Sequence, residues 1–400
     1  MSSTHDVVLV MIEPPLPFGN AAARWYYVLL KQLVTRGHRV RAFATTRTRA
    51  QADEALALFS EPEYDLRCYP QQERRTYAAA KWASVREPFS YVFSERMRAD
   101  LGGELARGYG VLHLEQLWSG WLAPRDTTRT VVNVHFLYTV DLAPQAGDPP
   151  RPFSERTRFR HTQWAEQRLL RRFSTITTLT PRLSQCTERI NPRARVQTIP
   201  LALDHTLYDA SPVRTGSRAP VVGLIGSFDW PPSRRAARRL IESLWPQIKA
   251  RVPDARLVVV GRSAARALAE FRAVTGLEIH EDVPDARPYF VDLDVLLYAP
   301  TEGSGMKVKV LEAMAHGVPV VTTTAGAEGL DVIDGVHADV SDVDAVLIDR
   351  CVALLRDPSL RARRAEHART LVRTQCDPER CVALVESVHA RIAAPVEQTT

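Results

Sequence analysis

The sequence predicts an α/β protein with two domains in tandem, each built on a doubly wound parallel sheet. The chain has 400 residues, of which 45% are hydrophobic, and this length exceeds what one core usually organises. Short β-branched runs alternate with longer amphipathic segments, as expected of βαβ units. A polar stretch with Pro, Gly and Ser interrupts the alternation near residues 204–219 and predicts a linker.

In the first domain, each expected strand is a short run rich in β-branched residues. These runs are 6–12, 39–46, 109–117, 130–138, 174–180 and 195–203. The first run precedes "AARWYYVLLKQLVTRG", an amphipathic segment that predicts a helix. Ligands of such folds bind beyond the carboxyl ends of the strands.

The second domain repeats the pattern, and a helical segment follows each run. Its expected strands are 221–228, 255–262, 277–283, 294–300 and 318–324. The chain closes with "DPERCVALVESVHARI", where Asp377 can cap a helix and Pro378 can occupy its first turn. We therefore expect a first domain over 1–205, a linker over 206–219, a second domain over 220–375, and a C-terminal helical segment over 376–400 that packs back on the first domain.

Charge and cysteine usage restrict the class of protein. The net charge of +6 suits an anionic ligand without choosing among nucleotide, nucleic acid and membrane surface. The five cysteines form no C-x-x-C pair, which argues against a disulfide framework or a zinc site. The N-terminus lacks the form of a signal peptide, and no segment approaches the roughly 18 apolar residues that span a bilayer. These features predict a cytoplasmic protein.

The densest basic stretch, "RPFSERTRFRHTQWAEQRLLRRFS" at 151–174, places arginines among aromatic residues at helical spacing. Two interpretations remain open: a solvated helix face, or a surface that faces a lipid or an acceptor, with peripheral membrane contact. Nucleic acid is disfavoured as a partner because no recognisable binding module accompanies the charge.

The glycine-rich segment "TEGSGMKVKVLEAMAHG" carries two of only five lysines, in a chain with 47 arginines. It follows an apolar strand and predicts a turn over "TEGSG" and then a helix over "MKVKVLEAMAHG", which begins at Met306 and ends at Gly317. Backbone N–H groups at a helix N-terminus favour phosphate, and the ammonium groups of Lys307 and Lys309 add to that field. Glu312 could accept hydrogen bonds from ribose hydroxyls, so the segment suggests a nucleotide diphosphate.

A plainer interpretation of the same segment is also open. Lys309 and Glu312 could form a surface ion pair on one helix, and the glycines could belong to an ordinary loop. No third glycine follows at the dinucleotide spacing, and the Walker pattern is absent from this segment.

The segment "EGSGMKVKVLEAMAHGVPVVTTTAGAEGL" resembles the donor-site signature of the retaining GT-B glycosyltransferases of family four, in the branch written GGGxRxKxLEAMAxGxPVVxT. "GSFDWPPSRRAARRL", "PPLPFGNAAARWYYVLLKQLVTRGHRV" and "ARVQTIPLALD" are similar to further segments of that family. The resemblance spans nearly the whole chain and implies two Rossmann-like domains that face a cleft.

By the same resemblance, Lys309 and Lys307 neutralise the donor diphosphate, and Glu312 holds the ribose. Arg234 assists, and His135 borders the donor sugar. The resemblance implies a catalytic set of His135, Lys309 and Arg234. It implies a donor-binding set of Gly19, Gly226, Val283, Gly303, Ser304, Gly305, Lys307, Lys309 and Glu312, with Val283 in the region that faces the base.

The sequence departs from the family pattern at several positions. Ser304 stands eight positions before Glu312, where the family has a first glutamate, and Glu302 is the nearest carboxylate. Asn20 replaces the second glycine of the N-terminal loop. These departures leave the donor base, the donor sugar and the acceptor unspecified.

The histidines and the paired aspartates can also be interpreted as structural residues without a role in catalysis or binding. His135 could be a hydrogen-bonded core residue, and His113 and Glu115 could either line the cleft or serve packing. The D-x-D strings at 292–294 and 342–344 could hold a metal, but chance and helix capping explain both better. No metal and no cofactor is expected.

Together with these residues, the family resemblance implies metal-independent transfer of a sugar, with retention of configuration, from a nucleotide-diphosphate sugar to a hydroxyl acceptor. The acceptor could be a glycan, a lipid-linked intermediate or a small molecule. Two alternatives stay open: a nucleotide-sugar epimerase on the same fold, and a catalytically silent protein that binds a nucleotide sugar.

Overall fold

The computed structural model describes residues 4–72, 85–144, 150–208 and 218–393. The chain divides into two compact units. Unit 1 comprises Met1–Asp204 and Pro378–Thr400, and unit 2 comprises His205–Asp377. Most of the expected linker, at 209–217, and the last seven residues of the expected C-terminal segment, at 394–400, lie outside the described residues.

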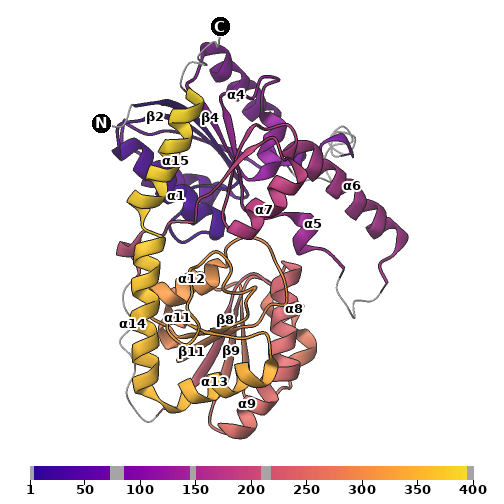
Figure 1. Cartoon of the computed structure of the whole chain (residues 1–400), viewed down its shortest axis with the longest axis vertical. Coiled ribbons are helices and arrows are strands. Elements are labelled where there is room, and N and C mark those ends of the chain that lie inside the picture. The colour runs from indigo at the N-terminus through magenta and orange to yellow at the C-terminus, as the bar shows by residue number, and fades with distance from the viewer. Residues whose placement is uncertain (1–3, 73–84, 145–149, 209–217, 394–400) are drawn as a thin grey trace. The chain divides into compact units, whose positions relative to one another are not determined.

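Unit 1 contains a seven-stranded parallel sheet in the order β3-β2-β1-β4-β5-β6-β7, as far as the chain is described. Two of its strands, β2 and β4, are labelled in Figure 1. The strands are β1 (Asp6–Met11), β2 (Arg39–Thr46), β3 (Asp65–Pro70), β4 (Val111–Glu115), β5 (Thr130–Val134), β6 (Thr175–Thr178) and β7 (Arg195–Thr198). Every residue of β4, β5 and β6 is buried, as expected of a parallel sheet that is covered on both faces.

Helices follow or connect the strands of unit 1. They are α1 (Ala21–Thr35), α2 (Arg49–Leu58), η1 (Ser90–Val92), α4 (Glu95–Arg107), η2 (Leu117–Leu122), α5 (Tyr138–Asp141), α6 (Phe153–Leu170), α7 (Pro181–Ile190) and α15 (Pro378–Ala393). The last of these, α15, packs against α1, β4 and β5. The end of the chain thus completes the core of the unit in which the chain begins.

Unit 2 contains a six-stranded sheet in the order β10-β9-β8-β11-β12-β13 over its described part. Its strands are β8 (Val221–Ile225), β9 (Arg256–Gly261), β10 (Leu277–Glu281), β11 (Val295–Tyr298), β12 (Val320–Thr322) and β13 (Asp339–Val340). Its helices are η3 (His205–Leu207), α8 (Pro231–Arg239), η4 (Leu240–Leu244), α9 (Trp245–Arg251), α10 (Ala264–Ala267), η5 (Ala269–Phe271), α11 (Arg287–Asp292), α12 (Val308–Ala315), α13 (Asp344–Arg356) and α14 (Pro358–Gln375).

The strand order creates one switch point in each sheet. In unit 1 the connections turn in opposite directions on the two sides of β1 and β4, and in unit 2 they do so between β8 and β11. A crevice opens at such a point beyond the carboxyl ends of the strands, and ligands of doubly wound folds bind there. The two switch points are where site residues are to be sought.

The structure adds two strands that the apolar runs did not predict. The edge strand β3 buries only Leu66 and Tyr69 of its six residues, so its sequence carries little hydrophobic signal. The strand β13 has two residues. Both lie at the edge of their sheet, where one neighbour is enough to define a strand.

No helix in the described part of the chain is long and apolar enough to cross a membrane.

A glycine inside β8 tests the packing of unit 2. A Cβ built on Gly223 would lie 2.2 Å from Cδ2 of Leu293, which is itself buried. We expect Gly223→Ala to lower the free energy of unfolding by about 1–3 kcal/mol through overpacking. Gly102, inside α4, has no atom within 4 Å of the same position, so Gly102→Ala should instead stabilise the protein by up to about 1 kcal/mol. Urea unfolding of both variants checks the opposite signs, and a neutral Gly223→Ala would contradict this packing.

Candidate active site

In unit 2 the glycine-rich segment connects the carboxyl end of β11 to α12. Gly303 and Gly305 have φ angles of 139° and 76°, which few L-residues adopt, so glycine is required for this turn. Helix α12 begins at Val308 with Lys307 as its N-cap, two residues later than the sequence predicts. The later start has a physical cause, since the backbone at Lys307, with φ −93° and ψ 86°, is not helical.

The side chain of Lys309 extends to the switch point of unit 2. Its Nζ donates a hydrogen bond of 2.9 Å to Oγ of Ser233 in the first turn of α8. The same nitrogen lies 4.1 Å from the ring centroid of Tyr298, the last residue of β11. A Cβ on Gly226 would lie 2.7 Å from Cε of Lys309, so only glycine at 226 leaves room for this lysine. Three elements therefore enclose one ammonium group.

The enclosed position changes the protonation of Lys309. Burial, with the nearby charge of Lys307 as a second cause, lowers the pKa of Lys309 to about 7. Its partners in the described residues are a hydroxyl group and an aromatic ring, and neither is an anion. A phosphate oxygen beside Nζ would restore the charged form, so the pocket favours an anionic ligand.

Lys307 turns back on its own loop. Its Nζ donates to the backbone oxygen of Gly305 at 2.6 Å and lies 3.9 Å from Oε2 of Glu328. A weaker bond of 3.4 Å reaches the backbone oxygen of Ser304, which is itself buried. These contacts hold the glycine-rich turn in shape.

The remaining predicted residues of unit 2 lie on α12, on α8 and in the loop after β10. Glu312 is half-buried on α12, one turn after Lys309, and Val283 is half-buried in the loop that follows β10. Arg234 is exposed on α8, whereas its neighbour Arg235 forms an ion pair with Glu302. Glu302 is thus paired with an arginine that the sequence analysis did not single out.

In unit 1 the switch point holds a buried carboxylate, Glu115, at the end of β4. His135 lies just after β5, and its Nε2 is 2.6 Å from Oε2 of Glu115. Nδ2 of Asn133 donates to the same oxygen at 3.0 Å, and Nε1 of Trp25 donates to Oε1 at 2.9 Å. Because Nε2 of His135 donates a hydrogen bond to Glu115, Nδ1 is the ring nitrogen of His135 that can act on another group.

A second histidine, His113, lies between Glu115 and His389 of α15 and contacts both. Nε2 of His113 lies 3.1 Å from Oε1 of Glu115, within electrostatic reach but outside hydrogen-bond geometry, and its Nδ1 is 2.9 Å from Nε2 of His389. Burial alone would raise the pKa of Glu115, but the close contacts with His113 and His135 and the charges of these histidines outweigh it and lower this pKa to about 2. Burial, and then the charges of neighbouring histidines, holds the pKa of His389 well below its usual value.

The loop after β1 also approaches this switch point. A Cβ on Gly19 would lie 2.6 Å from Cβ of Ala23, so glycine is needed for the tight entry into α1. Asn20, which replaces a family glycine, is the N-cap of α1, and its side chain accepts a hydrogen bond from the backbone N–H of Ala23. The substitution thus has a structural reason.

Among the described residues, no group of three or more His, Cys, Asp or Glu side chains could hold a metal ion. In the first D-x-D string, Asp294 instead accepts a hydrogen bond from the backbone N–H of Val221 and pairs with Arg218. In the second, Asp342 bonds to Thr324, and Asp344 begins α13 and pairs with Arg239.

Comparisons with known proteins fall on both units. Residues 21–202 match the family model described as "Glycosyl transferase 4-like domain", and residues 219–357 match "Glycosyl transferases group 1". A phosphatidyl-myo-inositol mannosyltransferase of Propionibacterium freudenreichii subsp. shermanii is 29% identical over 138 residues, which are 34% of this chain and 34% of that protein. The match thus spans about a third of that relative.

Solved structures resemble nearly the whole chain. Sucrose-phosphate synthase from Thermosynechococcus elongatus has a TM-score of 0.71 at 15% identity, with 97% of this chain and 99% of that chain covered. HepE from Anabaena, solved with UDP and glucose, has a TM-score of 0.66 at 14% identity, with 97% and 100% covered. WaaG, a glycosyltransferase of lipopolysaccharide biosynthesis, has a TM-score of 0.64 at 17% identity, with 95% and 99% covered. The predicted GT-B fold of two Rossmann-like domains is confirmed.

The buried histidine on α15 predicts a pH dependence of stability. Unfolded His389 takes up a proton below pH about 6.5, whereas the folded form stays neutral because its pKa is lowered. Stability should therefore fall as pH drops below about 6.5, by at most about 1.4 kcal/mol per pH unit from this residue. His389→Leu should remove that part of the slope in urea unfolding measured between pH 7.5 and 5.

Val385→Ala is the matched control, because Val385 is buried on the same helix and does not titrate. It should lower stability by a similar amount at every pH. Equal slopes for wild type and His389→Leu would show that the histidine is not held neutral.

Proposed function

We propose that this chain, a GT-B glycosyltransferase with a 4-like domain followed by a group 1 domain, transfers a sugar from a nucleotide-diphosphate sugar to a hydroxyl acceptor. Unit 2 would bind the donor, and unit 1 would supply most of the acceptor site. The proposal adds retention of anomeric configuration and independence from metal ions. It requires no cofactor beyond the donor.

The observation that carries the proposal is the enclosed ammonium of Lys309 between Gly226, Ser233 and Tyr298. It stands at the switch point between β8 and β11, where doubly wound sheets bind ligands. A pyrophosphate placed there would meet one lysine charge and the amino end of α12, both of which attract phosphate oxygens.

We assign to the other predicted donor residues the roles that the family resemblance implies. Glu312, one turn along α12, would accept hydrogen bonds from the ribose hydroxyls. Val283 would face the base, and Lys307 would hold the turn at 303–305 against the phosphate. Arg234 is exposed on α8, so its long side chain is free to swing toward the leaving phosphate.

In the reaction, the acceptor hydroxyl oxygen bonds to the anomeric carbon while the bond from that carbon to the diphosphate oxygen breaks. The leaving phosphate accepts the hydroxyl proton, and Lys309 offsets the charge that develops on it. One well-placed donor of this kind contributes about 3 kcal/mol to catalysis. His135 would border the donor sugar. Glu115 would hold the imidazole ring of His135 in one orientation and one tautomer.

Two observations bear on the acceptor class: the partial relative and the charge of the chain. That relative is named for an inositol phospholipid acceptor, and this chain has a net charge of +6. A lipid-linked acceptor fits both, and glycans and small molecules are the other candidates. The proposal implies a cytoplasmic protein with peripheral membrane contact.

A ligand panel tests the proposal. UDP, GDP, ADP and dTDP, each with its sugar derivatives, would be added to the purified protein and the shift in Tm recorded, because a ligand that binds the folded state raises Tm. We expect the nucleotides of one base to raise Tm more than those of the other three. Mass spectrometry of the products then separates transfer from epimerisation, which alters the donor without an acceptor, and from binding without turnover. The absence of any shift would contradict a donor site in unit 2.

Lys309 predicts a pH dependence of donor affinity. Since its pKa is about 7 without ligand and rises beside a phosphate, the affinity should fall by up to about tenfold per unit as pH rises above 7. Lys309→Ala should weaken nucleotide-diphosphate binding by about 100-fold and abolish this dependence. Calorimetric titration at pH 6.5 and 8.5 measures both effects.

Lys249→Ala is the control for net charge, because Lys249 binds the backbone oxygen of Ala255 at the opposite, amino edge of the same sheet. It should leave affinity and its pH dependence unchanged. Wild-type affinity in Lys309→Ala would remove the main support for the site.

The substitution Glu115→Gln distinguishes the role of unit 1 in catalysis from the role of unit 2 in donor binding. The amide keeps the size of the side chain but removes the charge that orients His135, so we expect kcat to fall by about tenfold or more. Donor affinity, which depends on unit 2, should stay within twofold, a margin of about 0.4 kcal/mol. Steady-state kinetics with calorimetric donor titration check the split. A loss of donor affinity with normal kcat would contradict these roles.

A further inference from the structure

One face of α6 carries mainly basic and aromatic groups along its exposed length, with the uncharged Thr157 and Gln167 among them. Phe153, Arg156, Arg160, Trp164 and Arg168 follow one another at spacings of three or four residues, so they share one side of the helix. All five are exposed, and Phe153 and Trp164 keep 76% and 52% of their surface accessible. We call these five residues the basic aromatic face.

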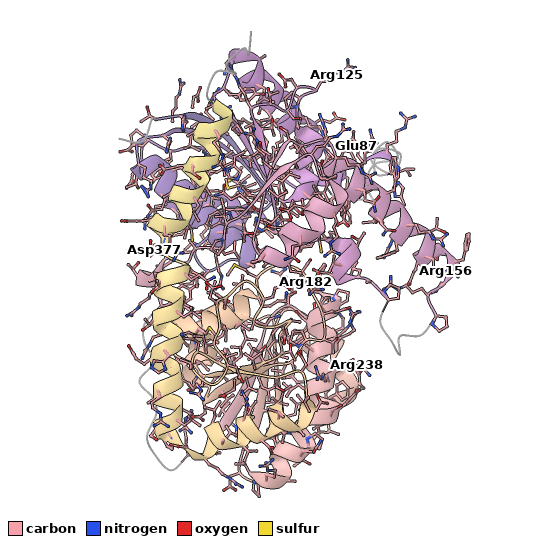
Figure 2. All side chains as sticks on the ribbon, viewed as in Figure 1. Glu87, Arg125, Arg156, Arg182, Arg238 and Asp377 are labelled. Carbon is pink, nitrogen blue, oxygen red and sulfur yellow. The ribbon has the colours of Figure 1, made fainter. Side chains whose placement is uncertain are left out.

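The rest of unit 1 holds α6 by its other side. Ala165, Leu169 and Leu170 are buried, and the helix packs on η2, α5 and α7. The buried carboxylate of Glu166 accepts hydrogen bonds from the backbone N–H groups of Tyr138 and Thr139, at 2.6 and 3.0 Å. These contacts fix the C-terminal half, while the N-terminal turns project outward with Arg156 near their tip (Figures 1 and 2).

Acidic residues are absent from this face. The two glutamates of α6, Glu155 and Glu166, lie on its opposite side. In the described part of the chain, no carboxylate pairs with the arginines of this face, and two of them contact aromatic rings. Arg156 lies 5.9 Å from the ring centroid of Phe153, and Arg168 lies 5.3 Å from that of Trp164. Their positive charge is therefore not offset by a paired carboxylate.

We propose that the basic aromatic face of α6 docks the protein on an anionic phospholipid bilayer. Guanidinium groups match lipid phosphates in charge and geometry, and Trp and Phe side chains favour the headgroup region. A helix that was merely solvated would gain nothing from two widely exposed aromatic rings among its arginines. Both features of the face thus have a role at a lipid surface.

This docking rests on the peripheral membrane contact of the proposed function and deepens it, because it assigns that contact to one surface of unit 1 that needs no donor. It would bring the enzyme to acceptors that are embedded in the bilayer. A failure of the donor site would leave docking intact, and the reverse also holds, so separate measurements judge the two proposals.

Co-sedimentation of the full chain with vesicles, without any nucleotide, tests the docking. We expect binding to vesicles of phosphatidylcholine with phosphatidylglycerol, little binding to phosphatidylcholine alone, and weaker binding as salt rises. Arg156→Gln with Arg160→Gln should weaken binding by about 25-fold, since each arginine near an anionic surface contributes about fivefold. Phe153→Ser with Trp164→Ser should weaken it several-fold at unchanged charge.

The matched control is Arg49→Gln with Arg96→Gln, which removes two exposed arginines of unit 1 that each face an aspartate on α2 or α4. It should keep vesicle binding. Failure of the wild type to bind anionic vesicles would overturn the proposal. The proposal would also be overturned if the control variant lost as much vesicle binding as Arg156→Gln with Arg160→Gln. Binding of the protein to a polyanion such as heparin but not to vesicles would overturn it as well.

Discussion

The enclosed ammonium of Lys309 is the interaction on which the organisation of unit 2 depends. Burying a lysine beside a hydroxyl and an aromatic ring is unfavourable for its charge, and the lowered pKa of Lys309 expresses that cost. The missing side chain of Gly226, the first turn of α8 and the end of β11 all make room for this one group. This unfavourable burial of the Lys309 ammonium would be compensated by an anionic ligand that pairs with it.

Unit 1 shows the opposite charge at the equivalent place. Glu115 is buried at the switch point and surrounded by donors from Trp25, Asn133 and His135. Its low pKa keeps it ionised, so it holds His135 in one orientation. Through His113, this group also reaches α15, so the C-terminal helix supports the same place in the sheet. The two units thus share a topology and differ in the chemistry placed at its crevice.

The sequence predicted the architecture well, because parallel strands buried on both faces leave continuous apolar runs. It missed β3, whose few buried residues carry little signal. In the site, Lys309 and Glu312 stand out in a short segment, but Ser233 and Tyr298 do not. Their role arises from contacts between residues far apart in the chain, which spacing cannot show. Adjacent Arg234 and Arg235 were likewise indistinguishable until the pairing of Arg235 with Glu302 was known.

The donor site proposed for unit 2 depends on Lys309 binding the pyrophosphate of an activated sugar. A crystal structure of the protein with the nucleoside diphosphate that binds best would test this contact. We expect a phosphate oxygen within about 3 Å of Nζ of Lys309, with the ribose beside Glu312. A nucleotide bound elsewhere, with the space between Gly226, Ser233 and Tyr298 unchanged, would contradict it.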